Sequence, residues 1–517
     1  MAQPLDSNPA LSQQLAYKAC ETGTIERPMS SLFLEPILNR LNPFWQGKPL
    51  VSLPAFKRWA FQVARQRLDH GMAKATVLSG PRQVGKSTLV LQIIQQLLAE
   101  GVAPRHILYV QFDELAEILK LKQPILQIVS WFEQHILRQS LNEAAQAGQR
   151  VYLFLDEVQN LDEWAPQLKH LVDTSDVRVL VTGSSALRIE QGRDSLAGRI
   201  TTLEMGTLFL REIMALRREG ELLAPLPLNG LSPLRDRAFW EELRAFGIRY
   251  AGLRDRAFAA FSERGAYPIA HAYPDVSWAE LADQLNETVI RRAIVHDLRL
   301  GPKGAKRDPQ LIEALFRLAC RYAGQTPKPT LFADELKQVM DANVSAQRIA
   351  AYLSFLDGTL LLRMVEPLEI RLKRRRSAAK ICLCDHALRA SWLQEVVPLA
   401  PDALDRLAHL RDLAGHLAES AVGYFLKSIT NIDLAHFPER HGEPEVDFVL
   451  SIGEQRVPLE VKYRRRIEPK SLNGLRHFLD KPIYNAPFGV LVTLSDDIVV
   501  DDPRIVCLPL STLLLMR

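Results

Sequence analysis

An eight-residue stretch of this sequence has the residue types and spacing of a phosphate-binding loop. Gly80-Pro81-Arg82-Gln83-Val84-Gly85-Lys86-Ser87 fits G-x-x-x-x-G-K-[ST], and it lies between an apolar run and a helical pattern. Such a loop curls its backbone N–H groups toward phosphates, while the lysine adds positive charge and the serine hydroxyl can ligate Mg²⁺. We therefore predict an ATP site with Mg²⁺. Its residues are Gly80, Pro81, Arg82, Gln83, Val84, Gly85, Lys86, Ser87 and Thr88.

Two acidic residues end a later apolar run and complement this loop. The run 151–155 is followed directly by Asp156 and Glu157. In a Walker-B arrangement Asp156 would hold the Mg²⁺ through water, and Glu157 would orient or deprotonate the attacking water. Many strands end in an acid, so the pattern gains its weight from its position downstream of the loop.

Two further positions complete the predicted catalytic set. Ser184 follows the run 177–181, where its hydroxyl can contact the γ-phosphate or the attacking water, or cap the next helix. Arg193 and Arg199 are candidates for an arginine finger supplied across a subunit boundary, or ordinary surface arginines. The predicted catalytic residues are Lys86, Glu157, Ser184 and Arg199.

Short apolar runs separated by helical patterns predict the elements that position these residues. The runs are 76–79, 107–112, 151–155, 177–181 and 200–203. This alternation is typical of a parallel sheet covered on both faces. We expect an α/β P-loop NTPase core over 71–217, after a helical extension over 1–70. Residues 218–308, rich in prolines and charges at their start, are expected to form an insertion and a helical connector or lid.

The pattern changes after residue 308, where three helices and a hairpin outline a winged helix over 309–390. Between the two strand-like runs lie five cations, at Arg371, Lys373, Arg374, Arg375 and Arg376. Such a basic wing, over 371–376, suits phosphate contacts that position a protein on DNA. The alternative is a solvated charge run on a winged helix that binds protein.

The last block, 391–517, carries a second constellation of charged residues. Side-chain alternation in a hairpin places Asp447, Glu460 and Lys462 on one face. This D-x₁₂-E-x-K spacing matches the PD-(D/E)xK nuclease core, in which the acids bind Mg²⁺, and Glu419 on the preceding helix fits its additional acid. A second metal site is therefore possible. The alternatives are cross-strand ion pairs on an exposed face, or a retained fold that serves as a platform.

Length and composition set outer limits. The chain has 517 residues, more than one hydrophobic core usually covers, and 47% of them are hydrophobic and 24% charged. This mix excludes a wholly disordered or fibrous chain. The net charge of +4 neither requires nor excludes nucleic acid. The few scattered cysteines, the lack of a long apolar run and the lack of a secretion signal favour a cytoplasmic protein with no membrane partner.

Several of these segments together resemble a known family. GPRQVGKST, LFLDEVQNL, VTGSSA, LAGR and GAYPIA look like the bacterial and archaeal AAA-like ATP-binding proteins, which end in a domain of unknown function 4143 that resembles restriction nucleases. The resemblance runs from about residue 70 to the C-terminus and is most specific over 76–205, whereas 218–250 matches no pattern. It implies nucleotide chemistry more than any pathway.

We therefore expect a protein that hydrolyses ATP and couples turnover to action on DNA. We expect it to form a homo-oligomer, either a ring or a smaller assembly. Two alternatives stay open. One is a nucleotide-controlled switch or scaffold in defence or toxin–antitoxin-type regulation. The other is an ATP-regulated, Mg²⁺-dependent DNA nuclease.

Overall fold

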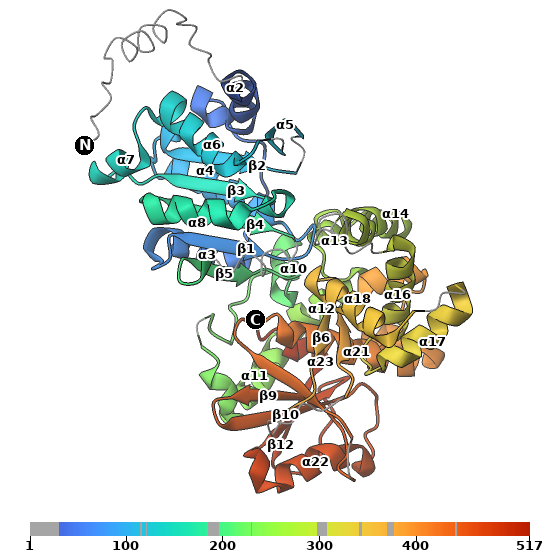
Figure 1. Ribbon diagram of the computed structural model, residues 1–517. Coiled ribbons are helices and arrows are strands. Elements are labelled where there is room, and N and C mark those ends of the chain that lie inside the picture. Colours follow the sequence, from blue (N-terminus) through green and yellow to red (C-terminus); the bar gives the residue numbers. More distant parts are fainter. Residues whose placement is uncertain are drawn as a thin grey trace, which may run out of the picture.

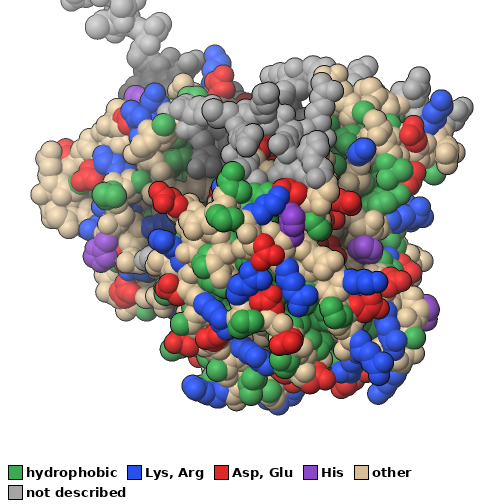
Figure 2. Space-filling model, turned by 90° about the horizontal axis from the view of Figure 1, so that it is seen from below, with side chains coloured by type: hydrophobic (Ala, Val, Ile, Leu, Met, Phe, Trp, Pro, Cys, Tyr) green, Lys and Arg blue, Asp and Glu red, His purple; other side chains and the backbone are tan. Residues whose placement is uncertain are grey.

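The computed structural model places an N-terminal sheet with its helices above a larger C-terminal part (Figure 1). The described residues are 30–113, 116–119, 121–184, 196–228, 230–296, 308–340, 344–369, 377–439 and 442–517. Basic and acidic side chains are interspersed over the face seen from below in Figure 2. Charge of one sign does not dominate that face, which agrees with the nearly balanced composition.

The N-terminal part is built on a parallel sheet of five strands in the order β2-β3-β4-β1-β5. The strands are β1 (Ala75–Ser79), β2 (Ile107–Gln111), β3 (Tyr152–Asp156), β4 (Arg178–Gly183) and β5 (Ile200–Glu204). Every neighbouring pair is parallel, with Ala75 opposite Val179 on one side and Ile200 on the other. The α/β class and the five predicted strands are confirmed.

Helices cover both faces of this sheet, because alternate residues of its strands point to opposite sides. Leu78, Phe154 and Leu180 pack with helices on one face, and Val77 and Leu153 lie in a separate core on the other. The first group of helices is α3 (Trp59–His70), α4 (Lys86–Ala99) and α10 (Leu210–Leu216). The second includes α2 (Ser30–Leu41), α6 (Pro124–Phe132), η3 (Glu133–Leu137), α7 (Leu141–Gln146) and α8 (Trp164–Thr174).

A helical region follows and contains a two-stranded antiparallel hairpin near its end. Its elements are α11 (Arg237–Arg249), α12 (Ala251–Arg264), α13 (Pro268–Ala272), α14 (Trp278–Leu285), η7 (Asn286–His296), α16 (Pro309–Arg321), α17 (Pro329–Met340), α18 (Ala346–Gly358), β6 (Leu362–Val365), β7 (Lys380–Leu383) and α19 (His386–Leu393). Three helices and a hairpin thus follow each other in the predicted order. The basic wing, 371–376, lies outside the described residues.

The C-terminal part contains a mixed sheet in the order β12-β11-β10-β9-β8. Strands β8, β9 and β10 are antiparallel neighbours, whereas β10, β11 and β12 are parallel. The elements are α20 (Pro401–Asp405), α21 (Arg411–Lys427), β8 (Asp433–Phe437), β9 (Val446–Ile452), β10 (Gln455–Lys462), α22 (Asn473–Asp480), β11 (Gly489–Thr493), β12 (Ile505–Pro509) and α23 (Leu510–Leu513).

The stretch expected as an insertion or lid packs against this C-terminal sheet. Helix α11 contacts α23 and β12. Arg254 of α12 donates two hydrogen bonds to the Asp496 carboxylate, at 3.0 and 2.7 Å. The Leu226 N–H donates to the Met516 carbonyl at 3.0 Å. Residues 226–254 therefore share a core with the end of the chain. Within the described ranges, we find no helix that is both long and apolar enough to span a membrane.

Candidate functional site

The predicted phosphate-binding loop joins the carboxyl end of β1 to the first residue of α4. Gln83 and Gly85 have φ angles of 62° and 94°, in the left-handed region that glycine adopts most easily. This conformation curls the chain so that α4 begins directly at Lys86. A helix N-terminus presents free N–H groups and a partial positive charge, which suits a phosphate.

Lys86 lies over this loop and is almost completely buried, at 4% exposure. Its Nζ donates hydrogen bonds to the carbonyl oxygens of Gly80, at 3.0 Å, and Pro81, at 2.9 Å. The same nitrogen lies 3.9 Å from Oε1 of Glu157. The structure therefore brings together the two predicted residues Lys86 and Glu157, which come from different strand ends.

Asp156, the last residue of β3, is fully buried beside the loop. Its carboxylate accepts hydrogen bonds from the hydroxyls of Thr182, Tyr109 and Ser87. Burial, with the nearby Glu157 charge, raises the pKa of Asp156, and the three hydrogen bonds oppose this rise. The Ser87 hydroxyl and the Asp156 carboxylate thus meet as a hard oxygen pair. This pair fits Mg²⁺.

Glu157 leaves the strand in a left-handed conformation, with φ of 58°. Its N–H donates to the Thr182 hydroxyl at 3.0 Å. The Gln159 amide, fully buried in the short turn η4 (Val158–Asn160), donates both to the Glu157 carboxylate and to the Ser184 hydroxyl, the latter at 2.9 Å. Ser184 is therefore connected to Glu157 through Gln159.

Three residues of this site were not in the predicted set: Tyr109, Gln159 and Thr182. Thr182 precedes Ser184 by two positions near the end of β4, and the β3–β4 register, with Leu155 opposite Val181, places it beside Asp156. Gln159 follows Glu157 by two positions, a spacing that puts its amide near the carboxylate only because η4 turns there. Tyr109 sits on the neighbouring strand β2, and no local pattern points to it.

Arg199 lies away from this site within its own chain. It directly precedes β5, where Ile200 pairs with Ala75 at the amino end of β1. The phosphate-binding loop follows the opposite, carboxyl end of β1. Arg199 is partly exposed and forms an ion pair with Asp173 of α8 at 2.6 Å. The other candidate, Arg193, lies outside the described residues.

A buried arginine supports the loop from behind. Arg58 donates a 2.7 Å hydrogen bond to the Val84 carbonyl, and it pairs with the Glu212 carboxylate of α10 at 2.9 Å. The same guanidinium donates to the carbonyls of Gly206 and Thr207, at 3.1 and 3.0 Å. Arg58 therefore ties the loop to the segment that leaves the first sheet.

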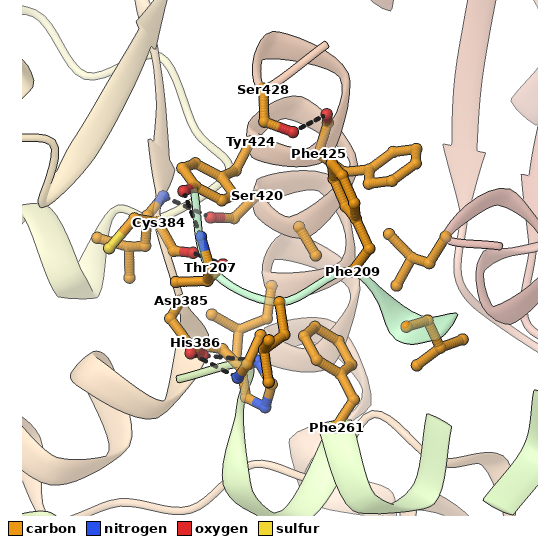
Figure 3. Close-up of a pocket in the computed structure, with 17 residues that line it drawn as sticks. Thr207, Phe209, Phe261, Cys384, Asp385, His386, Ser420, Tyr424, Phe425 and Ser428 are labelled. Carbon is orange, nitrogen blue, oxygen red and sulfur yellow. Dashed lines mark hydrogen bonds and ion pairs between the residues drawn. The ribbon is translucent and has the colours of Figure 1, made fainter. Parts of the chain in front are cut away.

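That segment enters a junction with the C-terminal part. Figure 3 shows Thr207 and Phe209 lying against Tyr424 and Phe425 of α21. These four residues are among those that line a cavity of about 50 Å³. Asp385 caps α19 and also accepts a 2.6 Å hydrogen bond from the Ala266 N–H.

Gly265 of the GAYPIA segment is required at this junction. Its φ is 76°, and a Cβ there would lie 2.3 Å from an oxygen of Asp385. A larger residue at position 265 would collide with Asp385, so the close packing of this segment requires glycine there.

The second predicted cluster also comes together, on the C-terminal sheet. The Val461 N–H donates to the Asp447 carboxylate at 2.9 Å, and Lys462 pairs with Glu460. A residue outside the predicted set, Lys380, pairs with Asp447 at 2.9 Å and with Glu419 at 3.1 Å. Burial opposes the charge of Lys380, but the surrounding carboxylates raise the pKa of its ammonium group.

The carboxylates of this cluster differ in their proton affinity. Burial, then the Asp447 charge, raises the pKa of both Glu419 and Glu460 to about 8. Asp447 is buried too, but the ammonium groups of Lys380 and Lys462 hold its pKa below the ordinary value. Negative charge is therefore concentrated on Asp447, next to Lys380.

Three known families match successive parts of this chain. Residues 72–214 match the AAA domain, 256–396 a domain of unknown function (DUF8612), and 414–513 a domain of unknown function (DUF4143). The first defines the class, an AAA-family ATPase domain. The chain thus combines an AAA domain with a DUF4143 domain, as the resemblance of its motifs predicts.

Two curated relatives share parts of the chain. An uncharacterized protein of Haemophilus influenzae is 22% identical over 60% of this chain and 68% of its own length. The uncharacterized protein MJ1637 of Methanocaldococcus jannaschii is 29% identical over 31% of this chain and only 33% of its own length. Neither name adds a function.

Solved structures overlap with this chain only weakly. The Aeropyrum pernix ORC1 protein in complex with DNA has a TM-score of 0.27 at 14% identity, covering 69% of this chain and 95% of that one. The S. cerevisiae Hsp104-ADP complex has a TM-score of 0.28 at 13% identity, covering 74% and 44%. Overlaps this low do not bear on function.

Proposed function

We propose that this protein binds ATP with Mg²⁺, hydrolyses it, and couples turnover to action on DNA. One observation carries the first two parts. The ends of β1 and β3 bring Lys86, Asp156 and Glu157 together beside a curled, helix-opening loop. Phosphoryl transfer needs this combination of a phosphate cradle, a metal ligand and a water-orienting acid.

Each residue has a distinct task in this proposal. The loop N–H groups and Lys86 bind the phosphates, and Ser87 with Asp156 holds the Mg²⁺. Bound Mg²⁺ neutralises charge that develops on the phosphate oxygens. Glu157 orients a water molecule and accepts its proton. Ser184 assists through its hydrogen bond with Gln159, and Arg199 serves a neighbouring subunit.

The direct test replaces Glu157 by Gln. An amide can position water without accepting a proton, so turnover should fall about 10²-fold or more while ATP binding persists. Lys86→Ala should instead lose nucleotide affinity. Glu163→Gln, at an exposed acid six residues further along the chain, is the matched control. Normal hydrolysis by a folded Glu157→Gln protein would place the base elsewhere.

The DNA part of the proposal rests on the element order of 309–383 and the basic wing, with the restriction-nuclease-like reading of the C-terminal sheet in support. The test compares ATP turnover alone and with single-stranded, duplex and branched DNA. Mass measurement in each nucleotide state reports the proposed homo-oligomer. DNA-stimulated turnover supports the proposal, and turnover that no DNA changes contradicts the DNA part.

A second candidate is a nucleotide-controlled switch, favoured by the continuous contacts between the loop and the junction. Arg58 links the Val84 carbonyl to the Gly206 and Thr207 carbonyls, and the Thr207 N–H donates to the Tyr424 hydroxyl at 3.4 Å. A conformational change in the phosphate-binding loop can therefore be transmitted to α21 through Arg58 and Thr207. Tight nucleotide retention with negligible turnover would favour this switch over the first proposal.

A further inference from the structure

The acidic cluster of the C-terminal sheet borders a cavity of about 770 Å³. Glu419 comes from α21, Asp447 and Glu460 from neighbouring strands, and Glu445 directly precedes β9. Residues of the turn after α16 and of the first turns of α17, among them Tyr322, Lys328 and Asp334, also line it. The charged Asp447 carboxylate in this group needs a compensating positive charge, because an unpaired buried charge is very costly.

Lys380 supplies that charge from another element. It is the first residue of β7 and is only 1% exposed. Its Nζ lies 2.9 Å from Asp447 Oδ1, 3.1 Å from Glu419 Oε2 and 3.7 Å from Glu445 Oε1. The Phe448 ring, 5.0 Å from this nitrogen, closes another side. The ammonium is thus held by three carboxylates and a ring face.

This arrangement leaves the cluster without a position for a divalent ion. Mg²⁺ needs oxygen ligands at about 2.0–2.1 Å in near-octahedral geometry. The Asp447 and Glu419 oxygens that could supply them converge on the ammonium instead. Throughout the described ranges, no three His, Cys, Asp or Glu side chains are grouped so that they could hold a metal ion.

We propose that Lys380 is the resident cation of this cluster, taking the place of a divalent ion and locking hairpin β6–β7 onto the C-terminal sheet. While Lys380 is in place, the cluster binds no divalent ion and serves only to hold the hairpin on the C-terminal sheet. Removing the ammonium frees the carboxylates, and a divalent ion then replaces it. This inference is independent of ATP hydrolysis.

Lys462 is the matched control, because it belongs to the same cluster with a different geometry. It pairs with Glu460, and its side chain is 20% exposed, against 2% for that of Lys380. It borders the cavity without lying between Asp447 and Glu419. Its removal should therefore leave the cluster closed to a divalent ion.

The test measures Mn²⁺ binding to the full chain without nucleotide, by electron paramagnetic resonance. The variants are Lys380→Met, Lys462→Met, Asp447→Asn and the double variant Lys380→Met/Asp447→Asn. We expect only Lys380→Met to gain about one bound Mn²⁺ per chain, and the double variant to lose it. Mn²⁺ should also raise the melting temperature of Lys380→Met alone.

Three outcomes would overturn the proposal. The first is Mn²⁺ binding by the unaltered chain that Asp447→Asn abolishes, since the cluster would then be open. The second is no gain in a folded Lys380→Met protein. The third covers misfolding: if neither Lys380→Met nor Lys380→Gln folds with or without Mn²⁺, a divalent ion cannot replace the ammonium.

Discussion

Glu157 is held by side chains from elements other than its own strand. Its backbone turns out of β3 with a left-handed φ, its N–H donates to Thr182, and its carboxylate accepts from Gln159. A general base must meet its water at a defined position, and small displacements reduce turnover steeply. The Gln159 amide is therefore the natural positioning group of the proposed site.

Gln159→Leu should lower kcat for ATP hydrolysis about tenfold or more, because the Glu157 carboxylate would lose the donor that orients it. The KM for ATP should change little, since Gln159 is not part of the phosphate-binding loop. Steady-state kinetics measures both. Gln167→Leu, which alters another buried glutamine of the same domain, is the control. A rise in KM at constant kcat would contradict this role.

His271 of α13, the residue directly after the GAYPIA segment, makes the stability of the fold depend on pH. Its Nε2 donates to the Gly265 carbonyl at 2.8 Å, while its buried Nδ1 has no hydrogen-bond partner among the described residues. Burial lowers the pKa of His271 to about 4, and the nearby Arg217 acts in the same direction. The hydrogen bond to Gly265 opposes this shift. The folded protein therefore holds this ring neutral.

Stability should fall as pH drops from about 6.5 toward 4. In this window the unfolded chain binds a proton at His271 and the folded chain does not, so acid favours unfolding. Melting temperatures measured at steps between pH 7.5 and 4.5 test this. His271→Gln should flatten the decline relative to the unaltered chain. An equally steep decline in that variant would assign the effect to other groups.

At the scale of elements, Arg58 connects α3 with α10 and the loop. Its side chain is 6% exposed and Glu212 is 3% exposed, so both charges are buried. Removing one partner of a buried ion pair leaves the other charge uncompensated. The loop would also lose the hydrogen bond to the Val84 carbonyl.

Arg58→Met should therefore lower the free energy of unfolding by about 3 kcal/mol. Denaturant unfolding followed by tryptophan fluorescence reports it, because Trp59 is adjacent. Arg65→Met, which breaks ion pairs at the rim of α3 with Asp69 and Glu100, should cost less than about 1 kcal/mol. Equal losses in both variants would show that Arg58 has no special structural role.

At the scale of the whole molecule, Arg199 and its own phosphate-binding loop lie at opposite ends of two neighbouring strands, Arg199 before β5 and the loop after β1. An arginine in this position can reach a nucleotide only in a neighbouring copy. This arrangement supports the proposed homo-oligomer, in which each site combines residues from two subunits.

Arg199→Ala should abolish most turnover and leave ATP binding intact, as should be visible by comparing hydrolysis with equilibrium binding. Mixing Arg199→Ala with Lys86→Ala subunits should restore partial activity. A boundary at which the intact loop of an Arg199→Ala subunit meets the intact Arg199 of a Lys86→Ala subunit is complete. Arg150→Ala, at another exposed arginine, is the control. No recovery on mixing would exclude a shared site.

The basic wing should contribute DNA affinity that does not depend on sequence. Replacing Arg374, Arg375 and Arg376 with Ala should weaken binding alike for different sequences and flatten its salt dependence, because fewer counterions are released. The control replaces Arg464, Arg465 and Arg466, a triplet that follows β10. If the wing variant keeps the same salt dependence of DNA binding as the unaltered chain, the basic run is only a solvated face.

The sequence by itself determined the local chemistry of this protein. The loop from Gly80 to Ser87 and the acids Asp156 and Glu157 are readable because short patterns specify backbone curl and strand ends. The alternation of a hairpin likewise assigned Asp447, Glu460 and Lys462 to one face. Periodicity also located the strands of the first sheet.

Only the tertiary structure decided which distant side chains complete these groups. Lys380 lies 67 residues from Asp447 along the chain, and Arg58 lies 154 residues from Glu212. No short sequence pattern identifies the partner of a buried charge, because the partner comes from whichever distant element packs against it. The pairing is needed because an unpaired buried charge is very costly. The same long-range packing places residues 226–254 against the C-terminal sheet, where composition alone indicated only a connector.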